Sequence, residues 1–406
     1  MQRHEQRLLS RRETFWLTGA GIALIATSYG LARFSYGLFV PVFQQEFGLD
    51  AATTGAIASG SYLSYCIAIV VSTLLTPRYG GRIVALAAGS IATVGTLLIG
   101  IAPNAALLAV GVLIAGASTG LASPPLAHAV AHTVRPHIRN RTQTIINAGT
   151  GLGLAVAAPI ALLTLDHWRA AWIAFAIVSA ATTAWVFRSV PAGPAYGRRS
   201  GTWASLIPKP LFPQGSGLLL LAAGLMGVAS TAIWTFGRDL LVSSGGLSET
   251  TSTLAWVFLG AFGMLGAASG DFGHKFGLRR SWRSFMLLMA LGTVMFALFP
   301  GSVSLAWIAA AAFGIAYLEL SGLLLIWGTN VYSYSPASGV GMTFLAIAIG
   351  QAIGSPLIGI VSELSGPRIA FILAGIIATM TAFLRPLSAR RSRTPHAAPK
   401  QVQDIA

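Results

Sequence analysis

Long apolar stretches alternate with short polar breaks along almost the whole chain. Many of the stretches contain about 20 residues, which as a helix is enough to cross the hydrocarbon core of a bilayer. Lipid offers no partner for backbone amides, so spans of this length must be helical. The breaks predict twelve spans, at 15–40, 52–75, 83–101, 105–127, 143–164, 170–188, 216–241, 252–271, 284–299, 304–328, 339–361 and 368–385.

The composition supports a membrane protein and excludes an ordinary soluble one. Only 9% of the 406 residues are charged, whereas a typical soluble domain has about a quarter, so the chain cannot build a charged surface. Hydrophobic residues make up 54% of the chain. We therefore expect an all-α integral membrane protein in contact with a lipid bilayer.

The basic residues indicate which way the spans are oriented. The net charge of +15 does not indicate nucleic-acid binding, because the basic residues form short clusters between apolar stretches. In the twelve-span arrangement, 22 of the 26 lysines and arginines fall on one side and three on the other, and only Arg33 lies well inside a span. The positive-inside rule then places both termini in the cytoplasm, here of a bacterial inner membrane.

An internal repeat divides the chain into two parts. An offset of 197 residues pairs Gly80 with Gly277, Gly153 with Gly350, and Arg188 with Arg385. The repeat predicts two parallel six-helix halves, an architecture in which a central site alternates its exposure. The expected units are a tail at 1–14, a half at 15–189, a linker at 190–213, a half at 214–386 and a tail at 387–406.

Two loops at equivalent places in the repeat carry a family resemblance. Residues 77–82 read Pro-Arg-Tyr-Gly-Gly-Arg, and residues 274–280 read His-Lys-Phe-Gly-Leu-Arg-Arg. Both resemble the D-R-x-G-R-R loop of the major facilitator superfamily, which the chain resembles from end to end. Residues 30–37, Gly-Leu-Ala-Arg-Phe-Ser-Tyr-Gly, are similar to its YbfB/YjiJ-type branch.

The resemblance implies that these loops control conformational change. Proline and histidine stand where the family has an acidic residue that latches one state, so Asp271 is the candidate substitute. The implied conformational residues are Arg78, Gly80, Arg82, Asp271, Gly277, Arg279 and Arg280.

Ionisable and aromatic side chains inside the spans are the candidate functional residues. Charges are costly in a bilayer, so the few that occur there usually face the bundle interior and serve function. Arg33 lies inside the first span, and Glu319 is the only carboxylate well inside any span. Tyr29, Arg33 and Tyr36 have the spacing of one helix face. The resemblance implies a central cavity lined by spans 1, 4, 7 and 10. The candidate substrate contacts are Tyr29, Arg33, Tyr36, Trp234 and Tyr317.

Other interpretations of these residues stay open. Arg33 could snorkel outward or pair with a backbone carbonyl, and Glu319 could hold a structural hydrogen bond in protonated form. The aromatic residues could serve packing or anchor the helices at the membrane interface.

The function that fits these features best is secondary active transport of a small organic solute, driven by protons. Arg33 would attract an anionic or polar substrate, and Glu319 would carry the coupling proton. The alternatives are an exporter of amphipathic or cationic compounds, and a membrane receptor that moves no solute. We expect a monomer that binds no nucleic acid.

An enzyme is not indicated. Residues 116–120 match the G-x-S-x-G pattern of hydrolases, but they lie within a span and not at a strand-to-helix turn. His128 and His132 have a spacing that metal sites use, but the sequence offers no third ligand nearby. Neither a cofactor nor a metal is therefore expected.

Overall fold

The computed structural model describes residues 8–164, 167–192, 210–265, 275–333 and 336–386. Within these ranges the protein is helical and contains no strand. The N-terminal helices are α1 (Arg11–Ile25), η1 (Ala26–Phe34), α2 (Ser35–Phe47), α3 (Ala51–Tyr79), α4 (Gly81–Gly100), α5 (Ala105–Thr133), η2 (Pro136–Ile138), α6 (Arg139–Asn147), α7 (Gly149–Leu163) and α8 (Trp168–Ser189). The C-terminal helices are α9 (Ser216–Asp239), η4 (Leu240–Ser244), α10 (Glu249–Gly263), α12 (Leu278–Leu298), α13 (Val303–Val331), α14 (Pro336–Ser365) and α15 (Pro367–Thr381).

The first span is longer than the predicted 15–40 and is not a regular α-helix throughout. It runs without a break from Arg11 to Phe47. Ser10 and Glu13 form a capping box at its start, and Gly48 ends it in a left-handed conformation. Its middle, η1, is a π-helix. The prediction that Tyr29, Arg33 and Tyr36 share one face assumed a regular α-helix through this segment. The hydropathy pattern does not reveal the wider turn of a π-helix.

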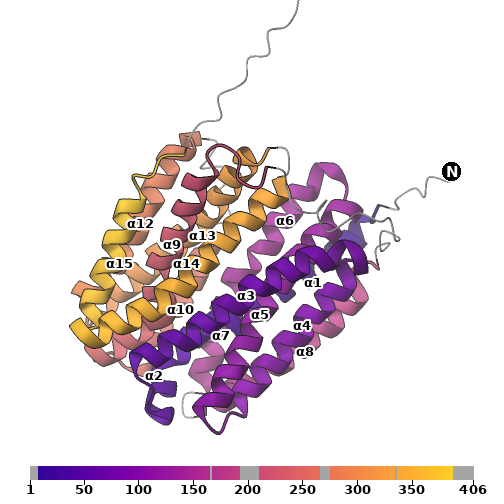
Figure 1. The fold of residues 1–406 in the computed structure, drawn as a ribbon. Coiled ribbons are helices and arrows are strands. Elements are labelled where there is room, and N and C mark those ends of the chain that lie inside the picture. The colour runs from indigo at the N-terminus through magenta and orange to yellow at the C-terminus, as the bar shows by residue number, and fades with distance from the viewer. Residues whose placement is uncertain (1–7, 165–166, 193–209, 266–274, 334–335, 387–406) are drawn as a thin grey trace, which may run out of the picture.

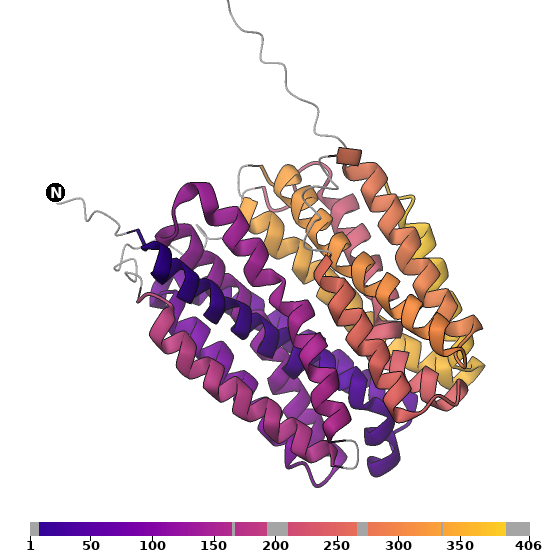
Figure 2. The ribbon, with the colours of Figure 1, turned by 180° about the vertical axis from the view of Figure 1, so that it is seen from behind.

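The described helices form two groups, α1–α8 and α9–α15, which lie side by side in Figures 1 and 2. Packing within the first group is closest among α3, α4, α5 and α8, and within the second group α10 and α12 pack on α13 while α14 packs on α9. The start of α1 and the end of α15 lie at the same end of the bundle, called the terminal end here (Figure 1). The end of α2 and the start of α3 mark the opposite end (Figure 1).

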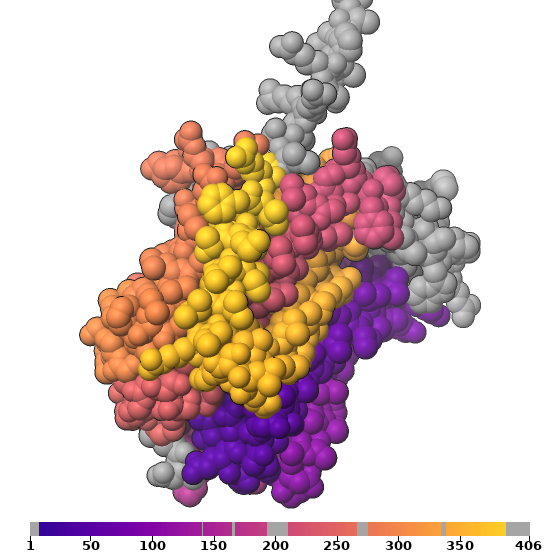
Figure 3. All heavy atoms as spheres, turned by 60° about the vertical axis from the view of Figure 1, so that its left-hand side comes forward, coloured from indigo at the N-terminus to yellow at the C-terminus, as the bar shows by residue number. Residues whose placement is uncertain are grey.

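The two groups touch through α2 with α9, α3 with α14, and α7 with α10. Glycines allow these approaches: a Cβ on Gly55 would lie 2.5 Å from the carbonyl oxygen of Ser355, and one on Gly260 would lie 2.6 Å from the amide nitrogen of Ala155. In Figure 3 the dark N-terminal helices meet the orange and yellow C-terminal helices along one seam. The contact of α2 with α9 brings the groups together at the opposite end. The contact of α3 with α14 begins there and continues past the middle of α3, where Tyr65 and Ile69 cluster with Ala348. At the terminal end, α5 of the first group and α13 of the second do not pack closely against each other, although the structure describes both helices in full.

Equivalent positions of the repeat have equivalent structures. Gly80 and Gly277 each precede a helix with positive φ, +84° and +81°, a conformation that favours glycine. Gly153 packs directly on the backbone of Ala26, and Gly350 packs in the same way on Gly224. The missing side chain at both glycines thus allows close helix packing.

Ten helical segments of the described chain are long and apolar enough to cross a membrane. Ten of the twelve predicted spans therefore meet this criterion. Among the others, α15 is a shorter apolar helix, and α10 ends at Gly263, shortly before residues 266–274, which lie outside the described ranges.

Candidate functional site

Arg33 lies in the π-helical segment of the first span and is buried, with 6% of its surface exposed. It does not snorkel to the surface, and among the described residues it donates no hydrogen bond to a backbone carbonyl. Its Nη2 donates a 2.8 Å hydrogen bond to Oε1 of Gln351, which comes from α14 in the other group. The guanidinium therefore joins the two groups of helices in the interior of the protein.

Gln351 extends this link into a polar network. Its Nε2 donates to the hydroxyl of Tyr317 on α13 at 3.2 Å and to Oγ of Ser230 on α9 at 3.3 Å. All of these side chains are buried. One amide thus connects four helical elements, which explains why a polar residue is tolerated in an apolar span.

Aromatic rings, and not carboxylates, surround the guanidinium. Its Cζ lies 4.5 Å from the ring centroid of Tyr65, 4.8 Å from that of Tyr62 and 5.2 Å from that of Phe34. The negative faces of aromatic rings attract a cation, and more strongly where water is excluded. Within the described ranges Arg33 has no ion-pair partner, and its buried Nε has no hydrogen-bond acceptor. The site therefore carries an uncompensated positive charge with an unused donor.

Two aromatic side chains, one from each group, stack beside this charge. Phe34 and Trp234 have ring centroids 4.1 Å apart and an interplanar angle of 23°. Tyr317 and Phe313 meet the ring of Trp234 edge-on at 5.1 and 5.4 Å. The stack lies at the contact of α2 with α9, where Gly37 touches the carbonyl of Trp234.

A small cavity opens between these residues. Its volume is about 10 Å³, which is room for about one water molecule. Its lining residues are Arg33, Phe34, Tyr36, Gly37, Ala58, Ser61, Tyr62, Trp234 and Thr235. The lining contains one positive charge, no negative charge and four aromatic rings.

Three of the five predicted substrate contacts, Arg33, Tyr36 and Trp234, line this cavity. Tyr317 lies behind Trp234 and reaches Gln351. Tyr29 is more peripheral: its ring packs edge-on against Tyr65, and its hydroxyl shares a 3.1 Å hydrogen bond with Ser123 on α5.

Glu319 does not line the cavity. It is buried, with 1% of its surface exposed, two residues beyond Tyr317 on α13. Two residues turn a helix by about 200°, so Glu319 and Tyr317 lie on different faces. The structure does not join Glu319 to Arg33 through the hydrogen bonds of Gln351.

The predicted conformational residues lie at the terminal end. Arg78 is in the last turn of α3, and Arg82 donates from Nε to the carbonyl of Val190 at 2.5 Å, within its own group. Arg279 and Arg280 are exposed in the first turn of α12, after Gly277. Asp271 lies outside the described residues.

The sequence interpretation missed part of the site. Gln351 is a polar residue in an apolar span, but the sequence does not show which residues it contacts. Phe34, Tyr62 and Tyr65 are residue types that are common in any protein core. Only their positions around the guanidinium of Arg33 distinguish them.

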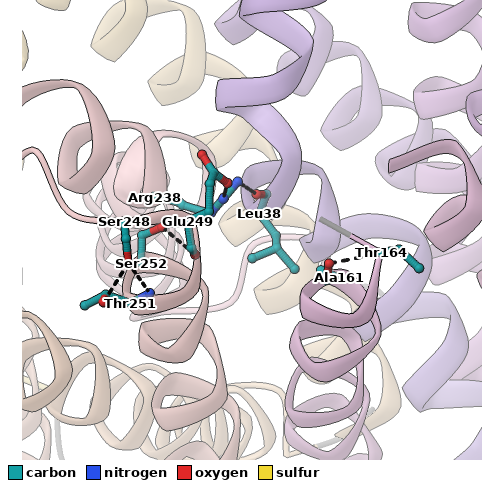
Figure 4. Close-up of polar contacts among 8 residues, drawn as sticks. All are labelled: Leu38, Ala161, Thr164, Arg238, Ser248, Glu249, Thr251 and Ser252. Carbon is teal, nitrogen blue, oxygen red and sulfur yellow. Dashed lines mark hydrogen bonds and ion pairs between the residues drawn. The ribbon is translucent and has the colours of Figure 1, made fainter. Parts of the chain in front are cut away.

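A second buried arginine connects the groups at the opposite end (Figure 4). Arg238 on α9 donates from Nη1 to the carbonyl of Leu38 on α2 at 2.6 Å. Its Nη2 pairs with Glu249 at the start of α10. Arg238 is 2% exposed and the Glu249 side chain 46%, so the pair lies at the edge of the buried region. This link holds α2 against α9 and α10.

Comparisons with known proteins agree with the fold. Residues 22–340 match the family model described as Major Facilitator Superfamily. The chain is 24% identical to the transcription regulatory protein OpdE of Pseudomonas aeruginosa over 265 residues, 63% of this chain and 64% of that protein. It is 30% identical to the uncharacterized MFS-type transporter YhhS of Escherichia coli over 155 residues, 37% and 36% of the two chains. The matched parts thus span less than two thirds of these relatives.

Solved structures share the same architecture. A bacterial homologue of the human lysosomal transporter Spinster, in an inward-facing and occupied conformation, superposes with a TM-score of 0.74. The match covers 93% of this chain and 97% of the other at 15% identity, and so concerns the fold alone.

Proposed function

Because the chain belongs to the Major Facilitator Superfamily, a family of membrane transporters, we propose that it is a secondary active transporter of a small organic anion. The observation that carries the proposal is Arg33: a buried guanidinium between the two groups of helices, with no carboxylate partner in the described chain. Burying an uncompensated charge is costly, so such a residue is usually retained for function.

The proposed topology is twelve spans in two halves, with both termini in the cytoplasm of a bacterial inner membrane. The charge asymmetry and the placement of α1 and α15 at one end support it. A reporter fused after Ala406 is expected to be cytoplasmic and one inserted at Ser244 periplasmic. The same compartment for both would contradict the topology.

In this topology the contact of α2 with α9 and the first part of the contact of α3 with α14, around Gly55, lie on the periplasmic side. The structure would then correspond to a state closed toward the outside, and transport would require these contacts to separate. The interactions of Arg33 with Gln351 and of Arg238 with Leu38 are among the hydrogen bonds that join the two groups, so that movement affects them directly.

Proton coupling is assigned to Glu319 in this proposal. An arginine stays protonated in proteins and cannot carry a proton, whereas a carboxyl group can. Glu319 lies on the same helix as Tyr317 but outside the cavity lining, which favours an indirect effect on the site through α13. We propose a monomer as the transporting unit.

The test is uptake of organic anions into proteoliposomes, with and without an imposed pH gradient. Arg33→Gln should weaken anion binding under every condition, whereas Arg135→Gln, at an exposed position, should not. Glu319→Gln should abolish accumulation driven by the pH gradient but leave counterflow exchange largely intact. Accumulation by Glu319→Gln at the wild-type level would show that Glu319 is not the proton carrier.

The alternatives give different results in the same assay. A receptor is favoured by the similarity to OpdE, whose name describes transcription regulation, and it would bind solute without counterflow. An exporter of cationic compounds is favoured by the aromatic lining of the cavity. The absence of an acidic residue from that lining makes the exporter the weaker candidate.

A further inference from the structure

We propose that the solute is a planar aromatic monocarboxylate. Its carboxylate would replace the amide oxygen of Gln351 on Arg33, and its ring would enter between Phe34 and Trp234. This inference rests on the transport function proposed above. It adds the chemical class of the substrate and makes Gln351 the residue that competes with it.

The charge of the cavity sets the charge of the ligand. Arg33 is the only charged residue in the lining, so the site balances a single negative charge. A neutral or cationic ligand would leave the guanidinium uncompensated, and a dianion would bring a second charge into an aromatic environment without a partner. A monoanion satisfies the site.

The donors of Arg33 specify a carboxylate. Nε and Nη2 lie on one edge of the guanidinium, which can bind both oxygens of a carboxylate through parallel hydrogen bonds. In the structure Nη2 is bonded to the Gln351 amide oxygen, whereas the buried Nε has no acceptor. The amide supplies one acceptor where a carboxylate supplies two, and it lacks the opposite charge. A carboxylate is therefore the better partner for this edge.

The stacked rings specify the rest of the ligand. Phe34 belongs to the N-terminal group and Trp234 to the C-terminal group, so relative movement of the groups changes the gap between them. A flat ring can enter such a gap and stack on both faces, whereas a saturated ring is too thick to do so. The Phe34 centroid lies 5.2 Å from Cζ of Arg33, so a carboxylate attached directly to the inserted ring would reach the guanidinium. The small cavity volume agrees with rings that pack on each other in this state.

Binding to the purified full-length protein in lipid nanodiscs, measured by calorimetry, tests the ligand class. The probes are benzoate, cyclohexanecarboxylate with the same charge but a puckered ring, benzamide without charge, and benzylamine with the opposite charge. Benzoate should bind roughly 10- to 100-fold more tightly than benzamide, as expected for hydrogen bonds to a charged group. It should bind about 2- to 10-fold more tightly than cyclohexanecarboxylate, the range of aromatic pair energies. Benzylamine should not bind.

Substitutions of Gln351 test the competition. Gln351→Glu places a carboxylate beside the guanidinium and should weaken benzoate binding by at least roughly 10-fold, since Arg33 then has an internal partner. Gln44→Glu, the same change at a half-buried position on α2 outside the cavity lining, should leave the affinity within about twofold. Gln351→Ala removes the competing amide and should keep or increase the affinity. Loss of benzoate binding in Gln351→Ala would overturn the displacement model even if Gln351→Glu folds poorly.

The aromatic ligand class and the transport function can be refuted independently of each other. Phe34→Leu should abolish the preference for benzoate over cyclohexanecarboxylate, and equal affinities already in the wild-type protein would overturn the aromatic class. If the affinities are equal, Arg33-dependent uptake of cyclohexanecarboxylate would still support the proposed transport function. Binding of benzoate with the expected pattern, but without counterflow in proteoliposomes, would instead overturn the transport function and support the ligand class.

Discussion

A single methyl group at the opposite end should shift the balance between the conformational states. Gly55 on α3 faces Ser355 and Pro356 on α14, at a contact between the two groups. A Cβ at this position would lie 2.5 Å from the carbonyl oxygen of Ser355 and 3.0 Å from Cα of Pro356. Both neighbours are backbone atoms, which cannot rotate away as a side chain can. Gly55→Ala should therefore push α3 and α14 apart.

The expected size of the effect follows from these distances. Ordinary van der Waals contact begins at 3.4 Å, so the carbonyl oxygen must recede by about 0.9 Å along the line of contact. Overpacking of this kind typically costs about 1–3 kcal/mol. The cost applies only to the state in which α3 touches α14. The ratio of that state to states with separated helices should thus fall by about 5- to 150-fold.

Pairs of spin labels can measure this shift by pulsed dipolar spectroscopy. In a Cys66→Ala background, labels at Gln45 and Ser243 report the opposite end, since both are exposed and lie in different groups. Gly55→Ala should add or enlarge a population with a longer distance between these labels. The control is Gly341→Ala on α14, where a Cβ would meet no atom within 4 Å. Because Gly341→Ala is also a glycine-to-alanine change within a helix, it accounts for the higher helix propensity of alanine.

Two results would refute the reasoning. An unchanged distance distribution in Gly55→Ala would show that the contact yields without separating the groups. The same change in Gly341→Ala would show that helix propensity, and not the contact, controls the equilibrium.

Three further predictions concern the ends of the bundle. Arg238→Gln should lower the free energy of unfolding in detergent by roughly 1.5–3 kcal/mol, the value of hydrogen bonds to a charged group, and an unchanged melting temperature would contradict the buried link. The pKa of Asp50 is held below its usual range by hydrogen bonds from Thr53, so its charged form stabilises the protein above about pH 4. The difference in melting temperature between the wild type and Asp50→Asn should hence vanish as the pH falls through the lowered pKa, and a constant difference would exclude this effect. Arg279→Ala combined with Arg280→Ala should slow counterflow exchange more than it weakens solute binding, and a loss of affinity at a normal exchange rate would argue for a binding role.

Sequence reasoning succeeded where a property depends on nearby residues. The all-helical fold follows from apolar stretches of sufficient length, because backbone amides in lipid can be satisfied only within a helix or a closed barrel. The family follows from two glycine-containing loops, and Gly80 and Gly277 have the same positive-φ conformation in the structure. Arg33 could be selected because a charge inside an apolar span is rare in any context.

Sequence alone could not predict which residues meet Arg33. Its hydrogen-bond partner Gln351 is 318 positions away, and the rings around it come from two helical elements, η1 and α3, while Trp234 of α9 stacks on one of them. The π-helical segment that presents Arg33 has no hydropathy signal, and the placement of Glu319 outside the cavity depends on the rotation of α13. Hydropathy determines that a segment is buried in the membrane. The rotation and separation of helices, set by packing of the whole bundle, determine which buried side chains form the site.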